Sequence, residues 1–151
     1  MTTSKTQALQ QISRLFDSQR LAVLSTVNQD QPHTSLVAFA ASPDLAHIYL
    51  LTPKTTRKYD NLTANPRVSM LINDSRNKTE DLYAAVAVTV TGRARPIDKT
   101  RHRQKLDLYL DRHPQLGEFS RAMTTAFIQV AIDRYDLVSR FQNVVKIRMA
   151  P

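Results

Sequence analysis

The chain has 151 residues, a formal net charge of +8, no cysteine and only two glycines. The missing thiols exclude disulfides, thiolate zinc sites and cysteine nucleophiles, and the scarcity of glycine excludes a glycine-rich phosphate loop. The positive charge suggests nucleic acid as a partner, but the cations are scattered, densest over residues 93–105, and only 7% of the residues are aromatic. We therefore do not expect nucleic-acid binding, and we attribute part of the charge to a small anionic ligand.

A chain of this length is expected to form one domain, residues 1–151. The first residues show no apolar core of signal-peptide length, and no stretch approaches the roughly 18 apolar residues of a membrane-spanning helix. We therefore expect a cytoplasmic protein with no membrane segment. Residues 4–18 repeat apolar side chains at helical spacing, from Ala8 to Phe16, which predicts an amphipathic helix that packs on the core.

Three short β-rich segments follow, over residues 21–27, 33–41 and 47–52. Turn-forming residues separate them, including Pro32 and Pro43. Short connections of this kind predict an antiparallel meander, and hence an up-and-down or barrel-like sheet.

The stretch after the third strand predicts a short helix. Pro53 should end the strand, and Thr55 or Thr56 should cap the helix. Asn65 and Pro66 should end it, because the residue before a proline is pushed out of the α region. A fourth strand over residues 67–72 follows at once.

The start of this helix carries the wrong charge for a helix start. Acidic residues are favoured there, yet Lys54, Arg57 and Lys58 crowd this one, which costs roughly 0.3–1 kcal/mol per misplaced charge. The arrangement becomes favourable when an anion binds, because backbone N–H groups, hydroxyls and both side-chain cations can contact it. A solvated basic turn is the alternative. The neighbouring threonines favour an anion site, and a phosphate is the anion we expect.

The rest of the chain predicts further strands and helices. A polar loop over residues 73–81 should lead to a fifth strand at 83–94, in which Gly92 permits a bulge. A helix should begin at residues 96–98, with Asp98 as its cap, and run to Leu110. A long strand at 127–138 and a short one at 141–149 would complete an α+β fold of roughly six strands and about four helices.

The stretch that begins at Thr52, passes through Thr56-Arg57-Lys58 and ends in Asn65-Pro66-Arg67-Val68-Ser69 resembles the flavin-phosphate segment of the pyridoxamine 5'-phosphate oxidase family. The resemblance implies the fold of that family, a six-stranded antiparallel split β-barrel with flanking helices. It also implies a homodimer with FMN in a groove between two barrels. By this resemblance Arg57 and Lys58 would bind the flavin phosphate, Thr52 and Thr56 would hydrogen-bond it, and Ser35, Leu36 and Val37 would meet the ring.

The chain departs from the oxidases of that family at several positions. Their ring-lining segment begins with Arg and ends with Lys, where this chain has Ser35 and Ala40, and Ala87 stands in place of a flavin-contacting Gln. No Arg-x-His follows Phe119, which argues against oxidation of pyridoxamine phosphate itself. The expected function is therefore an FMN-dependent oxidoreductase with an unidentified small-molecule substrate.

Other functions remain open. A non-catalytic flavin binder would need the same residues, and a deazaflavin has the same phosphate and a similar ring. Haem is less favoured, because no histidine follows His113. The histidines show no metal-ligand spacing, so no metal site is expected. No catalytic residue is assigned, because a flavin would carry the chemistry itself.

Overall fold

A computed structural model describes residues 5–140 and 143–149 of the chain. The elements in chain order are α1 Lys5–Ser18, β1 Leu21–Asn28, β2 Gln31–Ala38, β3 Ala40–Ala41, β4 His47–Pro53, α2 Arg57–Ala64, β5 Arg67–Asn73, α3 Asp81–Ala84, β6 Ala87–Ile97, α4 Arg103–Arg112, the 3-10 turn Pro114–Leu116, α5 Gly117–Arg121, β7 Thr125–Ser139 and β8 Asn143–Arg148. No helix in these two ranges is long and apolar enough to span a membrane.

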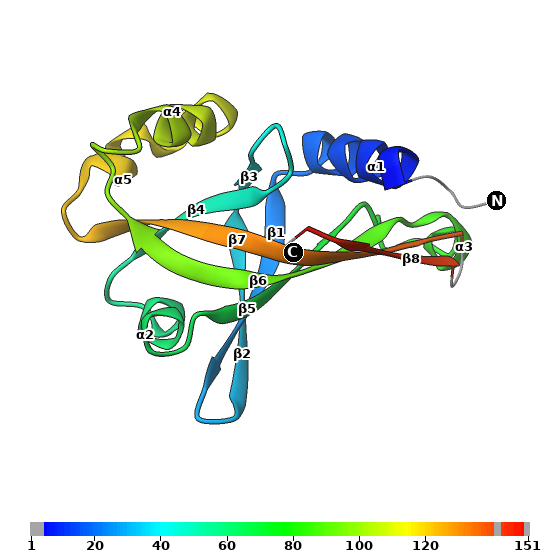
Figure 1. The fold of residues 1–151 in the computed structure, drawn as a ribbon, viewed down its shortest axis with the longest axis horizontal. Helices are drawn as coiled ribbons and strands as arrows, with labels where there is room; N and C mark the ends of the chain where they lie inside the picture. The colour runs from blue at the N-terminus through cyan, green and yellow to red at the C-terminus, as the bar shows by residue number, and fades with distance from the viewer. Residues whose placement is uncertain (1–4, 141–142, 150–151) are drawn as a thin grey trace.

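The strands form one antiparallel sheet in the order β2-β1-β5-β6-β7-β4-β3, and β8 pairs with β7. The sheet curls, so that β1 and β2 run steeply across the direction of β6 and β7, while α1 and α4 lie above it and α2 below (Figure 1). The expected antiparallel split barrel with flanking helices is confirmed. The described residues hold eight strands rather than six.

The strand β4 does not pair with β2, so the expected meander of three strands is wrong. It pairs along its whole length with β7 instead. The second expected strand is interrupted at Phe39, which is fully buried and whose amide donates to the carbonyl of Arg20 at 3.2 Å. Beyond this break only Ala40–Ala41 pairs with β4. The chain from β2 to β3 therefore joins the two halves of the curled sheet.

Two expected boundaries around β6 are wrong. The strand begins at Ala87 rather than residue 83, because residues 81–84 form the short helix α3. It then continues to Ile97, where pairing with β7 keeps the backbone extended, and α4 begins only at Arg103. Asp98 does cap backbone amides, but those of a turn, since its Oδ1 accepts from residues 100 and 101 at 2.9 and 2.8 Å.

Gly92 lies at a close contact between β6 and β7. The register of the two strands shifts between Thr91 and Gly92, which confirms the expected bulge. A Cβ atom on Gly92 would lie 2.5 Å from the carbonyl oxygen of Ala131 and 2.9 Å from Val130 Cγ1. Any larger residue here would have to move the backbone of β7.

Two apolar layers lie on opposite faces of β4. The larger one fills the barrel and is covered by α1; the smaller one lies under α4 and includes Leu106 and Tyr109. Because β4 lies between both layers, its five central residues are buried. This burial on two faces explains why the sequence of β4 is a continuous apolar run rather than an alternating one.

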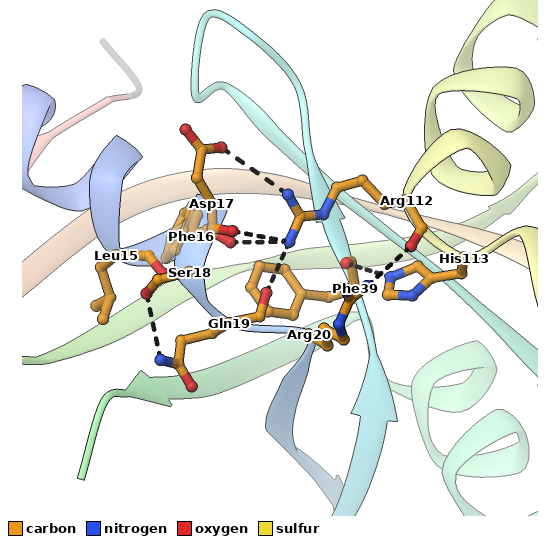
Figure 2. Close-up of polar contacts among 9 residues, drawn as sticks. All are labelled: Leu15, Phe16, Asp17, Ser18, Gln19, Arg20, Phe39, Arg112 and His113. Atoms are coloured by element: carbon orange, nitrogen blue, oxygen red, sulfur yellow. Dashed lines mark hydrogen bonds and ion pairs between the residues drawn. The ribbon is translucent and has the colours of Figure 1, made fainter.

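Arg112, the last residue of α4, fastens this helix to the end of α1 (Figure 2). Its Nη2 donates to the carbonyl oxygens of Phe16 at 3.1 Å and Gln19 at 2.8 Å. Carbonyls at a helix C-terminus lack intrahelical partners, and a cation there is favourable. The next residue, His113, is buried, and its Nε2 donates to the carbonyl of Phe39 at 2.7 Å. This clamp, Arg112 with His113, joins α1, α4 and the break after β2.

Candidate functional site

Two threonines hold the turn between β4 and α2. Thr52 is fully buried, and its Oγ1 lies 3.0 Å from that of Thr56. Thr56 caps α2, as expected, by accepting a hydrogen bond from the amide of Tyr59 at 3.3 Å. Both hydroxyls can also donate to the carbonyl of Pro53, at 3.2 and 3.0 Å. A hydroxyl has one proton, so a phosphate, which only accepts, would have to replace one of these bonds.

Arg57 and Lys58 form the first turn of α2 without a counter-ion. Arg57 is exposed and Lys58 half-buried, and neither side chain has a hydrogen bond or ion pair to any residue in the described ranges. Their backbone amides precede the first intrahelical bond of the helix. The start of α2 therefore presents two side-chain cations and two amides that an anion could contact.

A hollow of about 390 Å³ lies between the start of α2 and the tip of the β1–β2 hairpin. Its lining residues are Asn28, Gln31, Pro32, His33, Arg57 and Asn61. Asn61 is buried, and its Nδ2 donates to the buried Oγ1 of Thr26 at 3.1 Å. This bond holds α2 against β1. Because Arg57 is four residues before Asn61, both lie on the same face of the helix, toward the hollow.

The residues Ser35, Leu36 and Val37 do not share one face of β2. Side chains alternate along a strand, and here Val37 is buried in the core while Leu36 is 65% exposed on the other side. Ser35 lies on the same face as Val37 and His33. Its Oγ is buried and has no hydrogen-bond partner in the described structure. Only the main chain of these three residues is therefore presented together, along the free edge of β2, which is an edge strand.

An apolar patch covers the outer face of β2, β1 and β5. Leu36 and Leu71 both lie opposite Val23 in the strand register, and Leu21 is two residues away on β1. Leu21, Leu36 and Leu71 are all exposed. We call these four residues the outer patch. Contiguous exposed apolar side chains of this kind commonly mark a site of association.

Arg57 and Lys58 lie beside the capping Thr56, as the sequence predicts, whereas Asn61 and the tip of the β1–β2 hairpin were not among the predicted site residues. The available signal for Asn61 was its position one turn after Arg57, next to the buried Leu62. The hairpin residues gave no signal in the sequence. Their place at the hollow follows from the packing of α2 against β1 and β2.

The family model described as "Pyridoxamine 5'-phosphate oxidase" matches residues 8–139. The chain belongs to this family. A pyridoxamine 5'-phosphate oxidase homolog of Schizosaccharomyces pombe is 39% identical over 72 residues, which cover 42% of this chain and 38% of that protein. The chain thus matches well under half the length of this member of the oxidase family.

Solved structures share the fold at low identity. A heme-binding protein from Mycobacterium smegmatis superposes with a TM-score of 0.79 and 17% identity, over 90% of this chain and 56% of the other. A FAD-binding protein from Mesorhizobium loti gives a TM-score of 0.68 and 18% identity, over 85% and 90% of the two chains. These likenesses establish the split-barrel fold of the oxidase family for this chain.

Proposed function

We propose that the chain is an FMN-dependent oxidoreductase of the pyridoxamine 5'-phosphate oxidase family, which holds the flavin phosphate at the start of α2. The observation that carries the proposal is the pair of cations without counter-ions, Arg57 and Lys58, at a helix start beside a hollow. Membership of the family supports the idea that the bound phosphate group is part of a flavin.

The residues fit a phosphate group. A dianion would relieve the repulsion between Arg57 and Lys58, and its oxygens could accept bonds from both side chains and from the amides of the first turn. The roles of Thr52 and Thr56 are then to shape the turn and, after exchange of one internal bond, to donate to the phosphate.

We further propose that the flavin lies between two copies of the chain. Ser35, Leu36 and Val37 can meet one ring together only through the main chain of the β2 edge, because their side chains point to opposite faces. A second copy would cover the outer patch around Leu36 and enclose a ring that a single copy leaves open. The bound flavin would supply the electron-transfer chemistry, while the chain binds and orients it and excludes water.

A non-catalytic flavin or deazaflavin-binding protein is the second candidate, because the same cations suit either phosphate. Haem is a third, supported by the name of the M. smegmatis neighbour. A haem would need an axial ligand; His113 donates to the carbonyl of Phe39, so His33, which lines the hollow at α2, would have to supply it. Oxidation of reduced nicotinamide with an acceptor would separate an enzyme from a binder.

The experiment that tests the proposal is a titration of the purified chain with FMN, a deazaflavin and haem, followed by visible absorption and flavin fluorescence. We expect FMN to bind and to remain with the protein through gel filtration. The double variant Arg57→Ala/Lys58→Ala should weaken FMN binding by about 100-fold, since each lost charged contact accounts for about a factor of ten.

A matched control removes two exposed cations outside the hollow, Lys78→Ala with Arg101→Ala, and should leave FMN affinity unchanged. Equal affinity in the Arg57→Ala/Lys58→Ala variant and the wild type would overturn the phosphate site. A wild-type chain that ignores FMN but binds haem or a deazaflavin would overturn the choice of cofactor.

A further inference from the structure

A second basic pocket, of about 280 Å³, lies where α4 meets α5. Its lining residues are Lys99, Thr100, Arg103, Leu106, Leu110, Ser120 and Arg121. We call it the α4–α5 pocket. Three of these residues are cations and none is acidic. Two of the cations belong to the dense basic stretch over residues 93–105, to which the proposed FMN site assigns no role.

Lys99 is held at this pocket by a backbone contact rather than by a carboxylate. Its Nζ donates to the carbonyl of Ala122 at 2.9 Å, and an ammonium has three protons, so two remain for a ligand. Burial lowers the pKa of Lys99, and repulsion from Lys54 lowers it further. A bound anion would oppose both effects, because it favours the charged form of the amine.

The two arginines also retain donors for a ligand. Arg121 forms no hydrogen bond or ion pair with the described part of the chain, and its Nη1 lies beside Gly117. Arg103 pairs through Nε with Asp107 at 3.0 Å, but both side chains are more than half exposed. Exposed pairs of this kind contribute little, and the terminal nitrogens of Arg103 stay available.

The remaining lining of the pocket is mainly apolar. Leu106 is buried and Leu110 half-buried, so the pocket combines a cationic rim with an aliphatic floor. The hydroxyl of Ser120 donates its proton to the carbonyl of Gly117, so it has none left to donate to a ligand. The volume lies just below the range of about 300–1,000 Å³ that is usual for drug-sized ligands. A small molecule with one anionic group and one compact apolar part matches this lining.

We propose that the α4–α5 pocket binds a small organic anion, with its phosphate or carboxylate group among Lys99, Arg103 and Arg121 and its apolar part on Leu106 and Leu110. The pocket shares no lining residue with the hollow at α2. The two proposals therefore stand or fall separately.

The test is a two-dimensional 1H–15N NMR titration of the full labelled chain with phenyl phosphate, benzoate and neutral benzyl alcohol. We expect phenyl phosphate or benzoate to shift the amides of Thr100, Ser120 and Ala122 saturably, and the tighter of the two identifies the preferred anionic group. Arg121→Gln should weaken that binding about tenfold, since one charge-assisted contact is lost. Arg101→Gln makes the same charge change at a residue two positions from Lys99 that does not line the pocket. This control variant should bind the anion with wild-type affinity.

Three results would overturn the proposal. Equal weakening by Arg101→Gln and Arg121→Gln would mean that only diffuse surface charge attracts the anion. Binding of benzyl alcohol as tight as that of phenyl phosphate would remove the need for the cations. Shifts confined to the amides of Arg57 and Lys58 would mean that the anion occupies the α2 site alone.

Discussion

Replacing Arg112 with alanine should lower the free energy of unfolding by about 2 kcal/mol. A hydrogen bond to a charged group contributes about 1.5–3 kcal/mol. The structure has two bonds of good length, to Phe16 and Gln19; the third, to the carbonyl of Asp17 at 3.5 Å, is too long to count fully. The carbonyls freed at the end of α1 can bond to water, because the Arg112 side chain is itself 28% exposed. The expected loss of unfolding free energy for Arg112→Ala therefore stays near the contribution of a single buried hydrogen bond.

The competing explanation for any loss is the ion pair between Arg112 and Asp17. Its nitrogen and oxygen are 3.9 Å apart, and the carboxylate is 80% exposed, so the pair should contribute less than about 0.5 kcal/mol. Asp17→Asn removes this pair and keeps the carbonyl bonds. The two variants together decide which contact fastens α4 to α1.

Urea unfolding followed by circular dichroism gives both free energies. Arg112→Ala should also lower the melting temperature by roughly 4–8 °C, at about 2–4 °C per kcal/mol for a chain of this size. Arg112→Lys, which keeps the charge but loses the planar fork, should fall between the wild type and Arg112→Ala. Two results would show that the carbonyl bonds of Arg112 do not fasten α4 to α1: a loss for Asp17→Asn as large as that for Arg112→Ala, or a loss for Arg112→Ala below about 0.5 kcal/mol.

Three further predictions concern the packing of the sheet. Gly92→Ala should destabilise the fold by about 3 kcal/mol in urea unfolding, because the new Cβ would overlap the carbonyl of Ala131; wild-type stability would contradict the close contact. Burial lowers the pKa of His47 from its usual 6.5, so the folded chain binds fewer protons and loses stability as pH falls below 6.5. His47→Gln should flatten that part of the stability profile, and a profile parallel to the wild type would show that another group is responsible. Tyr109→Phe should cost about 1 kcal/mol, because the hydroxyl donates to the carbonyl of Ala38 at 3.1 Å; no loss would mean that water replaces the bond.

Features fixed by neighbouring residues could be predicted from the sequence. The amphipathic spacing of α1, the cap at Thr56 and the stop at Asn65 all depend on contacts within one or two turns. The cation pair at the start of α2 is equally local, so its conflict with the helix dipole was visible before the fold was known.

Features fixed by distant residues could not be predicted in this way. The pairing of β4 with β7 joins residues 47–53 to residues 125–131, and no local signal distinguishes this partner from the adjacent β2. The pairing of β6 with β7 is a second long-range contact; it keeps the backbone extended through Pro96, so that α4 begins later in the chain although Asp98 offers ordinary cap chemistry. The hollow at α2 likewise depends on a hairpin brought close by packing. By contrast, the opposite directions of the side chains of Ser35, Leu36 and Val37 could have been predicted, because successive side chains of any β-strand point to opposite faces.

The position of β7 as the shared partner of β4, β6 and β8 has a consequence for how the chain is made. A ribosome produces β1, β2, β4 and β5 well before residue 125, and the hairpin of β1 with β2 can form at once. Until β7 emerges, however, β4 can pair only with the two residues of β3, and its five buried side chains remain in water. An unpaired apolar strand in a nascent chain is a hazard for aggregation. Fragments that end before residue 125 should therefore precipitate or require a chaperone, whereas the chain through β7 can close its barrel.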